Sequence, residues 1–130
     1  AEVEYEDKES HSIYVAFELS DEAKAKASLS GKAALVIWTT TPWTLPANTG
    51  ISLHPKEKYV LTTDGYIVAK ALYESLLELG VVKGEISKEI EPKSFENQVA
   101  INPLNGRKSK VVLGDHVLMD SGTGGVHTAP

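Results

Sequence analysis

Residues 33–50 read AALVIWTTTPWTLPANTG, an apolar run that continues into three threonines and a proline-rich turn. The apolar run predicts a buried strand, and because threonine is β-branched we expect the strand to continue through all three. Alternation along the strand would place Thr39 and Thr41 on one face and Thr40 on the other. Pro42 cannot donate to a sheet and fixes its own φ, so the strand should end there. Hydroxyl groups would then gather at a strand end, where a small polar ligand could be held.

Short extended runs separated by turns make up most of the remaining sequence. Residues 59–63 and 66–68 flank Asp64-Gly65, a dipeptide typical of a β-hairpin. Residues 83–93 are charged and alternating, which suits an edge strand or a connector. The other short apolar runs predict strands at residues 13–19, 50–53, 111–113 and 116–119.

The clearest helix is predicted at residues 70–79, with Gly80 well placed to end it. Residues 20–27 predict either a short helix capped by Ser20 or a mobile loop. Because strands outnumber helices, we expect a mainly β domain, a small antiparallel sheet closed or folded as a barrel. The long helix should pack on this sheet through an apolar stripe of Leu72, Tyr73, Leu76, Leu77 and Leu79.

The chain has 130 residues, so residues 1–130 are expected to form a single domain with a modest core. No apolar run approaches the length of a membrane span. The absence of cysteine excludes disulfides, thiolate catalysis and cysteine-based zinc sites, and fits a reducing compartment. The formal net charge of −5 argues against a freestanding nucleic-acid binder. An acidic domain can still receive an RNA end when another domain of the same protein holds the RNA.

The candidate chemical groups do not include a recognisable nucleophile–base set or a metal motif. No serine lies in a nucleophile elbow, and the four histidines lack the spacing of a metal site. We therefore predict no metal and no cofactor. His127 differs from the others because it lies in the glycine-rich segment 122–130, GTGGVHTAP, where a flexible loop could let a ligand approach the backbone.

Residues 38–50 and 122–130 together closely resemble the two signatures of the editing domain inserted in isoleucyl-tRNA synthetase. The sister valyl and leucyl enzymes carry an arginine before the first proline and an acidic residue after it. Thr41 and Trp43 stand at those places here, which favours the isoleucyl branch. His127, after a valine, also matches the isoleucyl enzyme best. The resemblance extends over essentially the whole chain.

This resemblance implies a distorted antiparallel β-barrel with one or two peripheral helices, located in the cytoplasm. It implies a deacylase domain of an isoleucine–tRNA ligase that hydrolyses valine from tRNA(Ile), with valyl-adenylate as a second candidate substrate. The partners would be the 3′ end of tRNA(Ile) carrying valine and the remainder of the synthetase, with no membrane. The implied catalytic residues are Thr39, Thr41 and His127, and the implied substrate-binding residues are Thr40, Trp43, Asn48, Gly124, Gly125 and Val126.

Several alternatives remain open. The family holds the α-ammonium of the substrate with an acidic residue beyond Pro130, so residues 1–130 alone are expected to deacylate Val-tRNA poorly; Asp115 or Asp120 is another candidate carboxylate. The domain could instead be a non-catalytic docking module for the tRNA 3′ end, or a purely structural fragment. Trp43 could stack on a base or pack in its turn. The basic cluster 107–110 could be a solvated turn or could touch the tRNA backbone.

Overall fold

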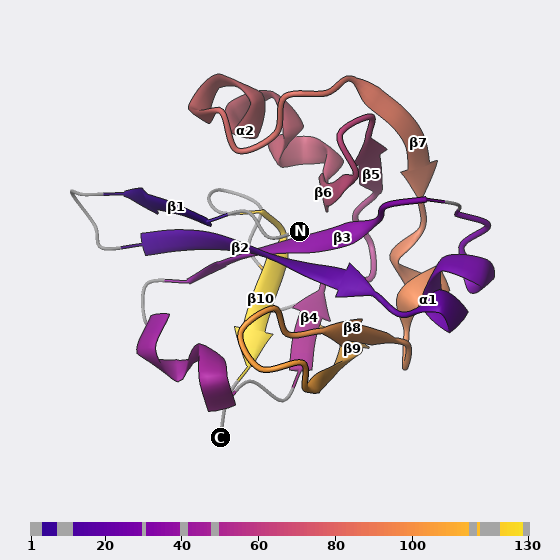
Figure 1. Ribbon diagram of the computed structural model, residues 1–130. Coiled ribbons are helices and arrows are strands. Elements are labelled where there is room, and N and C mark those ends of the chain that lie inside the picture. Colours follow the sequence, from indigo (N-terminus) through magenta and orange to yellow (C-terminus); the bar gives the residue numbers. More distant parts are fainter. Residues whose placement is uncertain are drawn as a thin grey trace.

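The strands of this computed structural model belong to one ten-stranded sheet, which closes on itself (Figure 1). Its strands are β1 (Glu4–Asp7), β2 (Ser12–Leu19), β3 (Ala34–Thr39), β4 (Gly50–Leu53), β5 (Tyr59–Thr62), β6 (Tyr66–Ala69), β7 (Ile86–Ile90), β8 (Val99–Ile101), β9 (Lys108–Leu113) and β10 (Gly125–Thr128). The structure describes residues 4–7, 12–29, 31–39, 42–47, 50–114, 117 and 123–128; among these, side chains are not described at 4–7, 12, 42, 43, 127 and 128.

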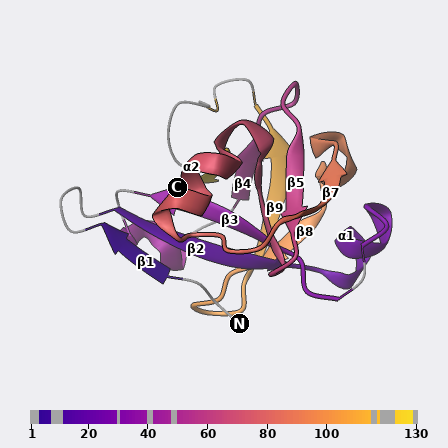
Figure 2. The same cartoon turned by 90° about the horizontal axis from the view of Figure 1, so that it is seen from above.

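Two α-helices, α1 (Asp21–Lys26) and α2 (Tyr73–Leu79), lie at separate places on the periphery of the strands (Figure 2). Short 3-10 helices precede or connect other elements: η1 (Pro42–Ala47), η2 (Lys70–Leu72) and η3 (Pro92–Phe95). In the part of the chain that is described, no helix is both long enough and apolar enough to cross a bilayer.

Six of the strands form a closed ring in the order β2-β8-β9-β4-β10-β3, which returns to β2. The closing pair, β2 with β3, is antiparallel and runs from Ile13 opposite Thr39 to Glu18 opposite Ala34. The hairpin β6-β5 and the edge strand β7 continue the sheet from β3 outside the ring, and β1 extends it from β2. The predicted barrel with peripheral helices is therefore confirmed.

The pairing is mixed, whereas the sequence predicted an antiparallel sheet. β3 pairs in parallel with both β10 and β6, and β4 pairs in parallel with β9. All three pairs join strands that are not neighbours in the sequence. Turn signals indicate which consecutive strands fold back on each other, but they carry no information on pairs joined by long crossovers.

Most of the local predictions are confirmed. Ser20 caps α1, its hydroxyl accepting the N–H of Ala23 at 3.2 Å. Gly65 has φ +91° in the β5–β6 turn, and Gly80 ends α2 with φ +79°. Strands β8 and β10 and the 3-10 helix η3 were not predicted.

The predicted apolar stripe on the long helix is only half correct. Leu72 and Leu76 are buried, but Leu77 is 41% and Leu79 is 64% exposed. Positions four apart lie above one another on a helix, so Leu72 and Leu76 share the face that packs on the sheet. Leu77 and Leu79 are left largely to solvent.

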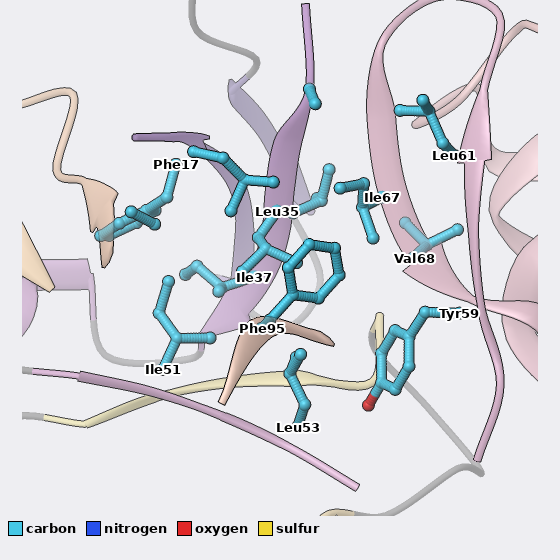
Figure 3. Packing of buried hydrophobic residues seen from close by; sticks show 14 of the residues in the cluster. Phe17, Leu35, Ile37, Ile51, Leu53, Tyr59, Leu61, Ile67, Val68 and Phe95 are labelled. Atoms are coloured by element: carbon cyan, nitrogen blue, oxygen red, sulfur yellow. The ribbon is translucent and has the colours of Figure 1, made fainter. Parts of the chain in front are cut away.

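The core is formed by residues of the ring strands together with residues of the β5–β6 hairpin (Figure 3). Alternate residues of β2 and β4 contribute to it, as period two requires. Strand β3 is buried almost throughout, in agreement with the apolar run that the sequence shows there. The labelled members in Figure 3 include Phe17, Leu35, Ile37, Ile51, Leu53, Tyr59 and Phe95.

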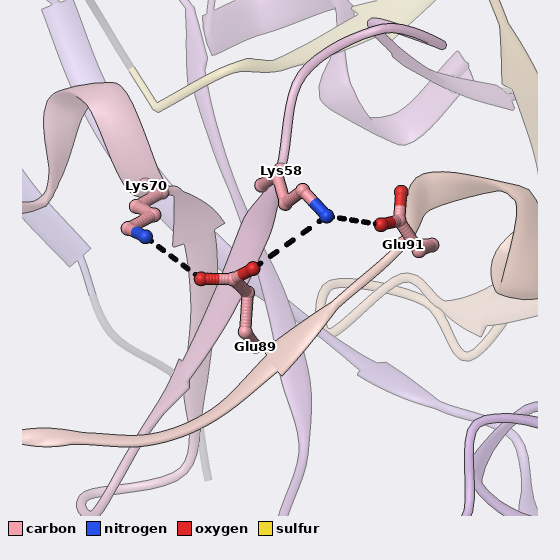
Figure 4. A network of polar contacts seen from close by, with 4 residues as sticks. All are labelled: Lys58, Lys70, Glu89 and Glu91. Atoms are coloured by element: carbon pink, nitrogen blue, oxygen red, sulfur yellow. Dashed lines mark hydrogen bonds and ion pairs between the residues drawn. The ribbon is translucent and has the colours of Figure 1, made fainter.

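The outer edge of the sheet is protected by a group of ion pairs (Figure 4). Glu89 of β7 contacts Lys70 at 2.8 Å and Lys58 at 3.7 Å, and Lys58 also contacts Glu91. All four side chains are exposed, so these pairs contribute little to stability. Charged side chains do keep an unpaired strand edge from joining other chains, and the predicted charged edge strand is confirmed.

Asp64 connects the β5–β6 turn to the segment that precedes β7. Its carboxylate accepts hydrogen bonds from the Thr62 hydroxyl and from the backbone N–H groups of Lys83 at 3.0 Å and Gly84 at 3.2 Å. Burial raises the pKa of Asp64, but these hydrogen bonds to the charged form outweigh it and hold the pKa below its usual value.

We expect Asp64→Asn to lower the free energy of unfolding at pH 7 by about 1 kcal/mol, because one of the two negatively charged oxygens that accept hydrogen bonds is lost. A carboxyl whose pKa is lowered by folding stabilises the protein above its unfolded pKa and loses this effect as pH falls through the folded pKa. The difference between parent and variant should therefore shrink at about pH 3. Urea unfolding at pH 7 and at about pH 3 measures the difference between parent and variant, with Glu78→Gln at an exposed position as control. A difference that is the same at both values would contradict the assignment.

Candidate ligand site around strand β10

The two sequence signatures meet in the ring, because β10 lies between β3 and β4. Val126 pairs in parallel with Trp38, and His127 lies opposite Ile51. Thr128, at the end of β10, lies opposite Gly50. The threonine-rich segment leaves the sheet on one side of β10 and returns to it on the other side. Its connection thus spans the end of β10, where residues from both signatures can face one ligand.

The structure describes only some of the predicted site residues. Thr39 is the last residue of β3 and is 7% exposed. Val126 is exposed, and the backbone of His127 is part of β10. Trp43 lies within η1, with its side chain outside the description. The other predicted residues in the connection, Thr40, Thr41 and Asn48, lie outside the described residues, as do Asp115 and Asp120.

Thr123 fixes the start of β10 to β3 and β6. Its hydroxyl donates to the carbonyl of Val36 at 2.6 Å and accepts the N–H of Gly125 at 3.2 Å. Its own carbonyl accepts the N–H of Ala69 at 2.9 Å. Thr123 is only 1% exposed. This part of the segment is therefore held on both sides by hydrogen bonds.

Close packing accounts for both glycines that follow Thr123. Gly124 has φ +83°, and a Cβ there would lie 2.5 Å from the Cβ of Ala69. A Cβ on Gly125 would lie 3.0 Å from the carbonyl oxygen of Val36. Glycine was expected here so that a ligand could approach the backbone. The packing supplies a reason that needs no ligand, because the backbone of β10 approaches its own neighbours this closely.

Side chains of the turn between β8 and β9 form hydrogen bonds with η1, the described part of the threonine-rich connection. The buried Asn102 donates from Nδ2 to the carbonyl of Leu45 at 2.9 Å. Asn105 donates to the carbonyl of Pro46 at 3.0 Å, and Arg107 Nη1 lies 3.5 Å from the same oxygen. The sequence indicated only a turn in this region, since an asparagine before proline carries no information on a partner 57 positions away.

The chemistry of the described part of the site is that of neutral hydrogen-bonding groups. A threonine hydroxyl donates one hydrogen bond and accepts others, so it can orient both a ribose and a water. Among the described residues, no group of three or more histidine, cysteine or acidic side chains could hold a metal ion. Exposed cations border the site on β9: Lys110 lies opposite Gly50 in the parallel pairing, and Lys108 precedes it on the same face.

Comparison with known proteins identifies relatives over the whole chain, although no family model matches it. The isoleucine–tRNA ligase of Aliarcobacter butzleri is 74% identical over 131 residues, and that of Sulfurimonas denitrificans is 68% identical over 130 residues. Each alignment covers 100% of this chain and 14% of the relative. The chain therefore spans about one seventh of the length of the ligases that it matches.

Solved structures with a similar fold come from synthetase editing domains. GlLeuRS-CP1 superposes with a TM-score of 0.71 at 16% identity, covering 88% of this chain and 53% of that one. The editing domain of the cytosolic leucyl-tRNA synthetase of P. knowlesi gives 0.70 at 14% identity, covering 88% and 56%. The chain therefore corresponds to a segment of the isoleucine–tRNA ligases, and its fold is that of the synthetase editing domains.

Proposed function

We propose that this domain hydrolyses valine that has been wrongly esterified to tRNA(Ile), with valyl-adenylate as a second substrate. The observation that carries the proposal is the position of β10 between the two ends of the threonine-rich segment. This arrangement can present both signatures to one ligand. The identity with isoleucine–tRNA ligases supports the choice of the isoleucine system. The partners would be the 3′ end of the tRNA and the remainder of the ligase, in the cytoplasm.

The proposed mechanism needs no nucleophilic side chain. An aminoacyl ester is already activated, because its α-ammonium withdraws electrons and a ribose hydroxyl lies next to it. Holding the ester and orienting one water can then supply most of the acceleration. We assign the water to Thr39 and Thr41, together with His127 on the amino-acid side. The terminal adenosine is assigned to Thr40, Trp43 and Asn48, and the valine side to Gly124, Gly125 and Val126.

A separate site is needed because the pocket that selects isoleucine for activation cannot exclude the smaller valine by size. One methylene in a hydrophobic pocket is generally worth only about 1–3 kcal/mol of discrimination. An isoleucine enzyme therefore activates valine as an error. A second pocket that admits valine and excludes the larger isoleucine removes the product.

A second candidate function is docking of the tRNA 3′ end without hydrolysis. The exposed side chains of Arg107, Lys108 and Lys110 favour contact with RNA, because Arg107 reaches Pro46 and Lys110 lies beside Gly50, both in the second half of the connection. Cations placed there could neutralise phosphates of a bound strand. Both candidate functions predict binding, and only the first predicts turnover.

Deacylation of Val-tRNA(Ile) and Ile-tRNA(Ile) by a full-length ligase that contains this domain tests the proposal. We expect hydrolysis of the valyl ester only. In His127→Ala the ratio of isoleucyl to valyl hydrolysis should rise by about 5- to 200-fold, because a wall of the pocket is removed. Lys93→Ala, at an exposed position in η3, serves as control and should leave the ratio unchanged.

Other results would reject parts of this assignment. Binding of a non-hydrolysable valyl-adenosine analogue without any turnover would select the docking module. Loss of valyl hydrolysis in His127→Ala without any gain of isoleucyl hydrolysis would show that His127 holds the substrate or the fold. An unchanged ratio would place the wall elsewhere.

A further inference from the structure

Tyr59, the first residue of β5, reaches the glycine-rich signature from outside the ring. It is 1% exposed, and its hydroxyl donates to the carbonyl of Gly124 at 2.6 Å. The same hydroxyl accepts the N–H of His54 at 2.9 Å. Figure 3 shows the tyrosine ring pointing towards the chain that leads into β10. The two partners are separated by 65 positions in the sequence, so the contact joins distant parts of the fold.

One peptide group at the start of β10 is fixed at both ends by side chains. The carbonyl of Gly124 and the N–H of Gly125 belong to the same planar unit. Tyr59 binds the first of these groups and Thr123 the second. Gly124 is in the left-handed region with φ +83°, and because glycine has no Cβ its backbone could adopt many other conformations. The two hydrogen bonds therefore select the direction in which β10 leaves this turn.

The hydroxyl of Tyr59 stays protonated over the physiological range. Burial raises its pKa to about 12, and this outweighs the opposing effect of the hydrogen bond from the backbone of His54. A protonated hydroxyl can donate to a carbonyl, whereas a phenolate would repel it. The hydrogen bond from Tyr59 to Gly124 is thus maintained throughout the physiological pH range.

We propose that Tyr59 is a positioning residue for the hydrolysis, acting through the peptide between Gly124 and Gly125 on the place of Val126 and His127. The inference rests on the proposed function. Misplacement of a reacting group by about 1 Å can cost a factor of about 100 in rate. Since β10 begins directly after this peptide, its rotation would displace the residues that we assign to the amino-acid side of the substrate.

Tyr59→Phe and Tyr73→Phe in the full-length ligase form a matched pair. The hydroxyl of Tyr73 also donates to a glycine carbonyl, that of Gly84, at 2.7 Å, but it lies on α2. Each variant loses a hydrogen bond to a glycine carbonyl, and Tyr59→Phe also loses the one that its hydroxyl accepts from the N–H of His54. We expect Tyr59→Phe to slow single-turnover hydrolysis of Val-tRNA at saturation by about tenfold or more, with a smaller change in KM, and Tyr73→Phe to leave the rate at the parent value.

Equal rates in the two variants would overturn the proposal, whereas a parent that does not hydrolyse Val-tRNA would overturn the proposed function itself. If Tyr59→Phe does not fold at the assay temperature, Thr123 gives the same test from the other side of the peptide. Thr123→Val removes the hydroxyl and should slow hydrolysis, while Thr123→Ser keeps it and should restore the rate. Parent-like hydrolysis by a folded Thr123→Val would equally reject control through this peptide.

Discussion

Gly124→Ala is expected to lower the free energy of unfolding by the sum of two effects. An alanine in the left-handed region costs about 1–2 kcal/mol. The new methyl group would also lie 2.5 Å from the Cβ of Ala69 and 3.3 Å from the Tyr59 ring, and overpacking of this kind costs about 1–3 kcal/mol more. Urea unfolding of the purified domain or ligase measures the change.

Gly80→Ala provides the control for the backbone term alone. Gly80 has φ +79°, and a Cβ there would meet nothing within 4 Å. Its replacement should therefore cost only the conformational part. Ala69→Gly combined with Gly124→Ala should recover part of the loss, because it removes the atom that the new methyl group meets. Equal losses in Gly124→Ala and Gly80→Ala would show that the neighbours of Gly124 move aside freely.

Thr41→Ala in a full-length ligase is expected to slow hydrolysis of Val-tRNA(Ile) by about 30- to 1000-fold. This factor corresponds to the loss of about 2–4 kcal/mol from a group that orients the water mainly in the transition state. The melting temperature should change little, since we expect this hydroxyl to face a ligand at the end of the strand, and surface substitutions usually alter stability by about 0.5 kcal/mol or less. Thr41→Ser, which keeps the hydroxyl, should retain most of the rate.

Single-turnover rates and thermal melts of the same preparations distinguish the two roles of Thr41. An unchanged rate together with a lower melting temperature would make it a structural residue. A rate lost equally in Thr41→Ser would show that the methyl group matters rather than the hydroxyl. The position lies outside the described residues, so this prediction rests on the threonine-rich signature.

The sequence predicts the elements of this fold better than their arrangement. The β5–β6 hairpin and the C-terminal end of α2 follow from local chemistry, because the conformation at Gly65 and Gly80 depends on the residue itself. The ring order does not follow, since β10 pairs with strands that lie far from it in the chain. Strand β8 has only three residues, too few for alternation to reveal it.

The candidate site shows the same division. Its residue types were evident from the two signatures, and the resemblance implied that they act together. The groups that hold these signatures were not predicted. Asn102 and Tyr59 stabilise backbone carbonyls that are 57 and 65 positions away, and neither side chain is part of a local pattern. Such contacts depend on the closed barrel and can be read only from its structure.

The place of β10 in the ring also has a consequence for biosynthesis. Translation produces β2, β3, β4, β8 and β9 before β10, although β10 separates β3 from β4. Until residues 123–128 emerge from the ribosome, the facing edges of β3 and β4 lack their final neighbour, and the nascent sheet stays open. Pairing over such long sequence separations is intrinsically slow. Closure of the barrel and assembly of the candidate site are therefore one event, so a chain that has not yet added β10 has neither.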